Sequence, residues 1–131
     1  MNNIEVVKKM YQLFAEGDTE KIKAIFDENL KWNMMVGFPN GGQYIGIEAV
    51  FENVFGYLSK YWDTWKAIST RYIETEEGVF VIGHYEGTYK KTGKAVKADF
   101  ASEYKVKDGK ITEYNQYTDT ALVIDAMKQT I

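Results

Sequence analysis

Apolar residues near the N-terminus recur at steps of three and four, the spacing that gives a helix one buried face. This spacing predicts a helix over residues 3–16, which Gly17 is well placed to end. Asp18 or Thr19 can then cap a second, short helix. The apolar positions of the two helices are Ile4, Val7, Met10, Tyr11, Phe14, Ile22, Ile25 and Phe26.

An alternation with a period of two follows and predicts a strand over residues 29–36. The inward positions of this strand are Leu30, Trp32, Met34 and Val36. Residues 37–46, which contain the single proline and several glycines, are typical of a loop. A third helix is predicted over residues 47–58, and its apolar positions are Ile47, Val50, Phe51, Val54, Phe55 and Leu58.

The second half of the chain alternates between apolar and polar positions and is divided by turn residues into β-hairpins. The predicted strands are 66–75, 79–90, 95–106 and 110–118. A final helix over about 119–129, capped by Asp119, should turn inward Leu122, Val123, Ala126 and Met127. Segregated helices and hairpins predict one α+β domain over residues 1–131, with a curved, mainly antiparallel sheet.

The two central strands of this sheet predict a hollow beneath the helices. A two-residue turn at Thr92-Gly93 would pair inward residues as follows: Tyr85 with Phe100, Gly83 with Ser102, and Gly87 with Ala98. Small residues would then meet small residues between large rings, which leaves volume for a ligand or water. The alternative is that a large helix side chain fills this volume, namely Met10, Phe51 or Phe55.

The last hairpin allows two registers. A three-residue loop at 107–109 with Gly109 left-handed makes Ser102 oppose Tyr114 and brings Gln116 onto the same inward face. A two-residue loop would instead turn Asn115 and Tyr117 inward. We favour the first register.

Composition narrows the chemistry that this domain can carry. The net charge of −3 does not indicate the positively charged surface that nucleic-acid binding requires. The chain has no cysteine and one histidine, which excludes disulfides, thiol nucleophiles and multi-histidine metal sites. We therefore expect no metal and no organic cofactor. No signal peptide or membrane span is visible, so we expect no membrane partner and a cytoplasmic location.

Four short segments together resemble a known family. They are Glu16-Gly17-Asp18, Gly42-Gln43-Tyr44-Ile45-Gly46, Lys107-Asp108-Gly109-Lys110-Ile111 and Tyr117-Thr118-Asp119-Thr120-Ala121. In this order of elements they look like SnoaL-like proteins, which belong to the ketosteroid-isomerase and nuclear-transport-factor-two-like superfamily. The resemblance implies a cone-shaped α+β barrel, also called cystatin-like, around a ligand cavity. It also implies a homodimer through the outer sheet face, on a fold that hosts both enzymes and binding modules.

The resemblance also gives positions for catalytic groups, and this sequence departs from the family at each of them. The ketosteroid-isomerase base falls on Met34, its tyrosine on Met10 and its protonated aspartate on Ser102. The histidine and aspartate expected in SnoaL-like cyclases fall on Ser102 and Gln116, neither of which titrates near neutral pH. Whether the protein is an enzyme is therefore left open.

Three other titratable residues have two interpretations each. His84 lies by alternation on the charged outer face near Asp99, which favours a solvent or dimer-face histidine over a catalytic His–Asp pair. Asp99 itself is predicted at the surface rather than at the cone mouth as a base. Asp63, between two tryptophans, is predicted as a turn residue rather than a buried carboxylate.

These observations predict a pocket for an apolar, ring-sized small molecule. The expected pocket residues are Tyr11, Trp32, Met34, Tyr85, Phe100, Ser102, Tyr114 and Gln116. The protein is either a cofactor-free enzyme of the isomerase, cyclase or hydrolase type or a non-catalytic binding module. A third hypothesis makes it an association domain, because Phe80 and Ile82 share the outer face with His84.

Overall fold

The computed structural model describes residues 2–129 and begins with two capped helices. Helix α1 (Asn3–Glu16) starts where the Asn2 side chain accepts a hydrogen bond from the Glu5 backbone N–H at 2.9 Å. It ends at Gly17, whose φ of 72° is a left-handed conformation that glycine adopts without strain. Asp18 caps the short helix α2 (Thr19–Ile25). Both predicted helices are confirmed.

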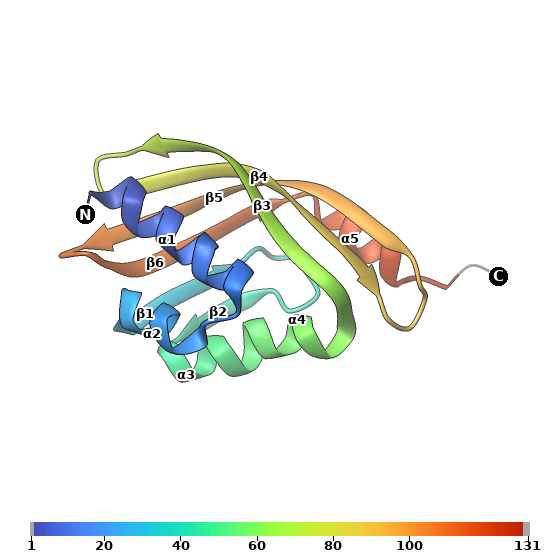
Figure 1. Ribbon diagram of the computed structural model, residues 1–131. Helices are drawn as coiled ribbons and strands as arrows, with labels where there is room; N and C mark the ends of the chain where they lie inside the picture. The colour runs from blue at the N-terminus through green and yellow to red at the C-terminus, as the bar shows by residue number, and fades with distance from the viewer. Residues whose placement is uncertain (1, 130–131) are drawn as a thin grey trace.

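Six strands form one mixed sheet in the order β2-β1-β6-β5-β4-β3, with only the β1–β6 pair parallel (Figure 1). Their bounds are β1 (Phe26–Met34), β2 (Gly42–Ile45), β3 (Trp62–Glu74), β4 (Gly78–Tyr89), β5 (Ala95–Lys107) and β6 (Lys110–Thr118). The prediction of an unbroken loop over 37–46 is wrong, because β2 lies within it. This short strand has no buried side chain, so alternation could not reveal it.

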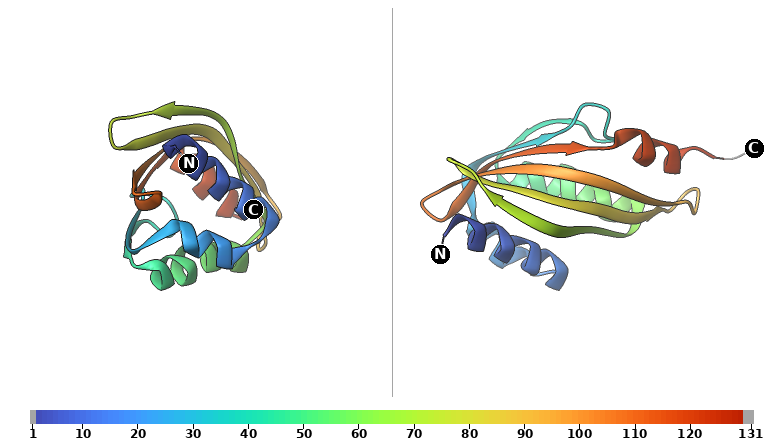
Figure 2. Two further views of the ribbon diagram at one scale, coloured as in Figure 1. Left: turned by 60° about the vertical axis from the view of Figure 1, so that its left-hand side comes forward. Right: turned by 90° about the horizontal axis from the view of Figure 1, so that it is seen from above.

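The third predicted helix is longer than expected and contains an irregular turn. It runs as α3 (Ile47–Val50), a π-helical turn over Phe51–Phe55, and α4 (Gly56–Tyr61). This helix, α1 and α2 lie on the concave side of the sheet, as the views in Figure 2 show. Helix α5 (Thr120–Met127), capped by Asp119, lies at the opposite end of the sheet from the N-terminus (Figure 1).

The residues predicted to face inward on β1, and the inward residues that we paired between β4 and β5, are buried, except Val36 on β1. On α5, the exception is Leu122. Val36 is 89% exposed because β1 ends at Met34 and the chain then turns, with the Phe38 N–H donating to the Met35 carbonyl. Phe38 takes the inward place instead, at 4% exposure. Leu122 is also largely exposed, because the short α5 turns only Val123 and Ala126 fully inward.

The predicted register of β4 and β5 is wrong by two residues. The loop is longer than two residues, since the Tyr89 N–H donates to the Lys94 carbonyl at 2.9 Å. A shift of two keeps every side chain on its predicted face but changes its partner. The observed pairs are Tyr85 with Ala98, Gly83 with Phe100, Gly87 with Val96 and Val81 with Ser102.

This register fills the places that we expected to be bare. A Cβ atom on Gly83 would lie 2.8 Å from Cζ of Phe100, and one on Gly87 would lie 2.8 Å from Cε3 of Trp65. Two aromatic rings therefore rest on the glycine backbone. The proposed origin of a hollow at these glycines is wrong, and the rings that close it come from the sheet rather than from Met10, Phe51 or Phe55.

The last hairpin combines the two registers considered. Its loop has two residues, Asp108 and Gly109, both left-handed, so the predicted three-residue loop is wrong. A β-bulge opposite Lys105 and Val106 then shifts the alternation by one residue. Tyr114 and Gln116 consequently point inward, as predicted, and Ser102 pairs with Gln116 rather than with Tyr114.

Candidate functional site

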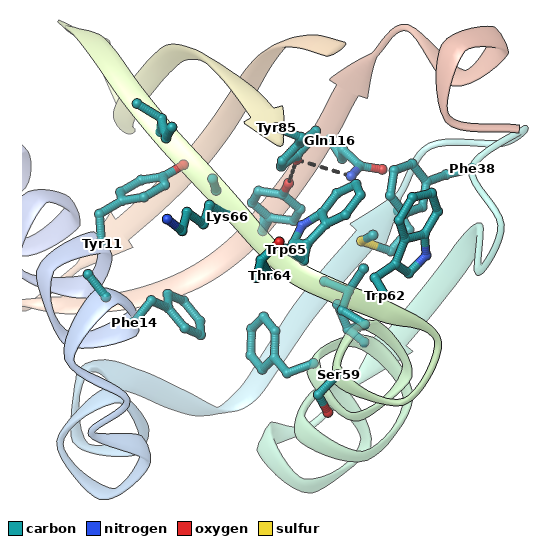
Figure 3. Close-up of a pocket in the computed structure, with 18 of the residues that line it drawn as sticks. Tyr11, Phe14, Phe38, Ser59, Trp62, Thr64, Trp65, Lys66, Tyr85 and Gln116 are labelled. Carbon is teal, nitrogen blue, oxygen red and sulfur yellow. Dashed lines mark hydrogen bonds between the residues drawn. The ribbon is translucent and has the colours of Figure 1, made fainter. Parts of the chain in front are cut away.

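A cavity of about 890 Å³ lies between the concave face of the sheet, helix α1 and helix α4 (Figure 3). Its rim includes exposed residues of the edge strand β3, among them Asp63 and Lys66. The apolar and aromatic residues that line it include Met10, Phe14, Trp32, Met34, Phe38, Val54, Phe55, Leu58, Trp62 and Trp65. A cavity of this size can hold a ligand of several fused rings.

The cavity walls are held in place by aromatic packing. Trp32 stacks on Tyr114 with ring centroids 3.9 Å apart and planes at 20°. Tyr85 stacks on Phe100 at 4.5 Å, and Trp62 meets Trp65 edge to face at 4.9 Å. Trp65 turns inward because the pairing of β3 with β4 is interrupted between Asp63 and Lys66. Packed rings of this kind preserve the shape of the cavity without a ligand.

A polar cluster forms part of the cavity floor, and its hydrogen bonds orient Gln116. The backbone N–H of Met35 donates to Oε1 of Gln116 at 3.1 Å, so the amide nitrogen must face the other way. Nε2 of Gln116 donates to the hydroxyl of Tyr85 at 3.1 Å (Figure 3). The Tyr114 hydroxyl lies 3.1 Å from that of Tyr85 and 3.2 Å from Oγ of Ser102.

A second hydroxyl pair joins α1 to β5. The hydroxyls of Tyr11 and Tyr104 are 2.8 Å apart, and their rings meet edge to face at 6.0 Å. Tyr104 also packs against Tyr114, with ring centroids 5.0 Å apart, so the two polar clusters are neighbours. The floor of the cavity therefore presents hydroxyls from α1, β4, β5 and β6.

Burial sets the protonation state of these phenols. Removal from water raises the pKa of Tyr11, Tyr104 and Tyr114 well above the usual 10.0. Burial also raises the pKa of Tyr85, and the hydrogen bonds that Tyr85 makes with Tyr114 and Gln116 act in the opposite direction. All four phenols are neutral at pH 7 and can act only as hydrogen-bonding groups, not as bases.

Six of the eight residues predicted for the pocket line the cavity: Tyr11, Trp32, Met34, Tyr85, Tyr114 and Gln116. Phe100 and Ser102 are buried but do not line it; Phe100 supports Tyr85 and Ser102 bonds Tyr114. Sequence reasoning did not place Tyr104 among the eight pocket residues, although Tyr104 shares the inward face of β5 with Ser102 and lines the cavity. It also missed Phe38 and Trp65, whose positions depend on irregular backbone that carries no periodic signal.

The other candidate acids and bases lie outside the cavity interior. Nε2 of His84 is 2.7 Å from a carboxylate oxygen of Glu86 on the outer face of the sheet, and His84 pairs across the strands with Asp99. Among the described residues, Asp63 is the one acidic or histidine side chain that lines the cavity, and it is exposed at the rim. The interior thus lacks an acid–base pair.

The described residues contain neither a cluster suited to a metal ion nor a helix suited to span a membrane. Within residues 2–129, no three acidic or histidine side chains gather closely enough to hold a metal ion. None of the helices in this part of the chain is both long and apolar enough to cross a lipid bilayer.

A helix-lined, curved sheet around one aromatic cavity defines a class of small cone-shaped α+β proteins. The model of the SnoaL-like domain family matches residues 7–114, and the chain belongs to this family. The structure of an NTF2-like protein from Burkholderia thailandensis is 30% identical, with 98% of each chain covered and a TM-score of 0.93. No curated protein sequence matches the chain.

Two more distant structures share the fold. TerC, crystallised with polyporic acid, is 23% identical over 95% of this chain and 97% of its own, with a TM-score of 0.86. A protein with a ketosteroid isomerase-like fold from Catenulispora acidiphila, in complex with trimethylamine, is 12% identical with a TM-score of 0.82. It covers 98% of this chain and 96% of its own. The predicted fold and superfamily are therefore confirmed.

Proposed function

We propose that this protein binds an apolar, ring-sized small molecule in the cavity, with the ring system between aromatic walls and an oxygen atom at the hydroxyl clusters. The observation that carries the proposal is a cavity of about 890 Å³ with aromatic walls and buried hydroxyls in its floor. A wholly apolar cavity would favour hydrocarbon, whereas buried hydroxyls favour a ligand with one or a few polar atoms.

The residues that line the cavity are better suited to ligand binding than to acid–base catalysis. The phenols of the floor are neutral at pH 7, and the amide of Gln116 does not titrate. A general base within reach of a buried ligand is absent among the lining residues, apart from Asp63 at the exposed rim. TerC, which shares this fold and was crystallised with polyporic acid, gives precedent for ring-bearing ligands on the fold.

A second candidate function is catalysis by hydrogen bonding alone. Gln116 donates to Tyr85, and a phenol that accepts a hydrogen bond becomes a stronger donor. Such a donor can stabilise negative charge that develops on a carbonyl oxygen. Turnover would then need a base from the substrate or from water, so we rank catalysis below binding.

Thermal unfolding with a panel of fused-ring ligands tests the proposal. A ligand present at about 100 times its Kd should stabilise the protein by roughly 2.7 kcal/mol. Ala67 lines the cavity from β3, so Ala67→Trp should fill the opening and abolish this gain. Ala95→Trp is the matched control, because Ala95 is exposed on β5 and does not line the cavity. Equal stabilisation of both variants would contradict binding in this cavity.

Turnover assays on the stabilising ligands separate the two functions. Stabilisation without any product, followed by mass spectrometry over hours, supports the binding module. Product formation that disappears in Ala67→Trp but persists in Ala95→Trp would make the enzyme the better description.

We also propose a homodimer through the outer face of the sheet. That face carries half-buried Phe80 and Ile82 beside exposed Tyr117, and it is ringed by both lysines and carboxylates. A face with mixed charges can pair with a second copy of itself. Light scattering should give twice the 15.1 kDa of one chain. Ile82→Lys should shift the mass to that of a monomer, whereas a monomeric wild-type protein would contradict the proposal.

A further inference from the structure

Two lysines and one aspartate lie at the exposed rim of the cavity. Asp63 and Lys66 come from β3, and Lys90 directly follows β4. In residues 2–129, the ion pairs are formed by other cations, namely Lys21, Lys23, His84 and Lys105. The two rim lysines are therefore not neutralised by a carboxylate of this part of the chain, and the opening of an apolar cavity carries excess positive charge.

Lys90 is held at the rim by two hydrogen bonds to the end of α4. Its Nζ donates to the backbone carbonyl of Ser59 at 2.9 Å, and its backbone N–H donates to the carbonyl of Tyr61 at 3.1 Å. Ser59 also lines the cavity and marks this edge of it in Figure 3. The ammonium is thus positioned beside the opening in advance, which lowers the entropy cost of binding a ligand there.

The bond to Ser59 leaves much of the donor capacity of Lys90 unused. An ammonium has three hydrogens, and the Ser59 carbonyl accepts one of them. This carbonyl is neutral, so it does not compensate the positive charge. A carboxylate supplies both an acceptor and a negative charge, and charge-assisted hydrogen bonds of this kind are stronger than neutral ones.

The surroundings of Lys90 decide how deep such a carboxylate can lie. The cavity wall next to the rim is apolar and includes Leu58 and Trp62, against which a carboxylate would lose its hydration. Lys90 itself is exposed, so an acid group beside it stays in contact with water. This arrangement suits an amphipathic molecule with its rings inside the cavity and its acid group at the rim.

We propose that Lys90 binds an acid group of the ligand, so that the cavity takes organic anions in which an apolar ring system carries a carboxylate. The inference rests on the proposed binding function and adds the charge of the ligand to it. Lys90 is then a specificity-determining residue, because a neutral molecule with the same rings fills the cavity without using the ammonium.

The matched probes are 2-naphthylacetate and 2-naphthylacetamide, which have the same rings and nearly the same shape but differ in charge at neutral pH. Isothermal titration calorimetry should give about tenfold tighter binding of the acetate, the effect of one charge-assisted hydrogen bond. This preference should shrink between about 0.01 M and about 1 M salt, since the Debye length falls from roughly 30 Å to roughly 3 Å.

Lysine variants locate the cation. Lys90→Met removes the ammonium and keeps an apolar stem, so the preference for the acetate should be lost. Lys91→Met is the matched control, because it changes the net charge equally at an exposed neighbour that does not line the cavity. Its preference should persist, and Lys90→Arg should restore most of the preference by restoring the charge. A purely structural role of Lys90 would instead weaken both probes equally in Lys90→Met.

The outcomes separate this inference from the proposed function. Equal affinity of the wild-type protein for acetate and acetamide would overturn the inference and leave ring binding intact. A preference that persists in Lys90→Met, or that falls equally in Lys90→Met and Lys91→Met, would also overturn it. Failure of both probes to bind would contradict the proposed function and the inference with it. If Lys90→Met fails to fold, the wild-type affinity ratio and its salt dependence still decide the question.

Discussion

Gly83 on β4 lies directly beneath the ring of Phe100 on β5, so that a Cβ atom at position 83 would come within 2.8 Å of Cζ. The same Cβ would clash with the backbone carbonyl oxygen of Ile68 on the other neighbouring strand. Two neighbours thus exclude any side chain at this position. The ring of Phe100 in turn supports Tyr85, whose hydroxyl joins the floor of the cavity.

Gly83→Ala should therefore be strongly destabilising. Overpacking against a backbone oxygen cannot be relieved by a side-chain rotation, and we expect a loss of about 2–3 kcal/mol in the free energy of unfolding. Urea denaturation measures the loss. Gly93→Ala is the control, because Gly93 has an open surrounding and only its φ of 72° opposes a side chain. That strain should cost roughly 1 kcal/mol. Equal losses of stability in the two variants would mean that Phe100 and Ile68 move to make room for the added methyl group.

Gln116→Leu should destabilise the protein by about 1–3 kcal/mol, because it leaves the Met35 N–H and the Tyr85 hydroxyl without their partner in a buried site. The pKa of Tyr85 should rise further, since Gln116 is one of the donors that lower it. Chemical denaturation and ultraviolet titration measure the two effects. Gln43→Leu, at an exposed position of β2, should change stability by less than about 0.5 kcal/mol. If Gln116→Leu lowers stability no more than Gln43→Leu does, the hydrogen bonds of Gln116 do not contribute to stability.

The buried tyrosines predict a loss of stability in alkaline solution. Burial raises the folded-state pKa of Tyr11, Tyr85, Tyr104 and Tyr114 above 10.0, so these phenols keep their protons in the folded protein while the unfolded chain loses them. The folded state then binds more protons, and stability falls as the pH rises above 10. Each phenol contributes up to about 1.4 kcal/mol per pH unit in that range.

Denaturation between pH 8 and pH 11 tests this slope. Tyr104→Phe should reduce the loss of stability at alkaline pH, because it removes one phenol that stays protonated in the folded protein. Tyr117→Phe, at a position that is 49% exposed, should leave the loss in place. A stability profile that is flat through pH 11 would contradict the description of the cavity floor as a set of neutral, desolvated phenols.

Local pattern was sufficient for most of the elements. Helical spacing with Asp18 and Asp119 as caps, and alternation between turn residues, predict five of the six strands and the helices within a few residues. The faces of the central strands also follow from alternation alone, because a side chain on a pleated strand can point to only two sides. Six cavity residues could be predicted in this way.

The irregular positions could not be predicted. Ile111 and Tyr114 are both buried although they are three residues apart, which strict alternation forbids and the bulge between them allows. The short β2 pairs with β1 without burying any side chain, so only its neighbour defines it. In each case the local residues permit several conformations, and packing against a distant strand selects one.

The sequence by itself determined the α+β class, the inward row of aromatic and hydroxyl side chains, and the absence of cysteine chemistry. The tertiary structure alone decided where the empty volume lies: Phe100 and Trp65 close the space over the glycines, and the cavity opens instead beside α1, α4 and β3. The physical reason is that alternation fixes the face of a side chain, whereas loop lengths and bulges fix its partner. A shift of two residues keeps every face and replaces every contact.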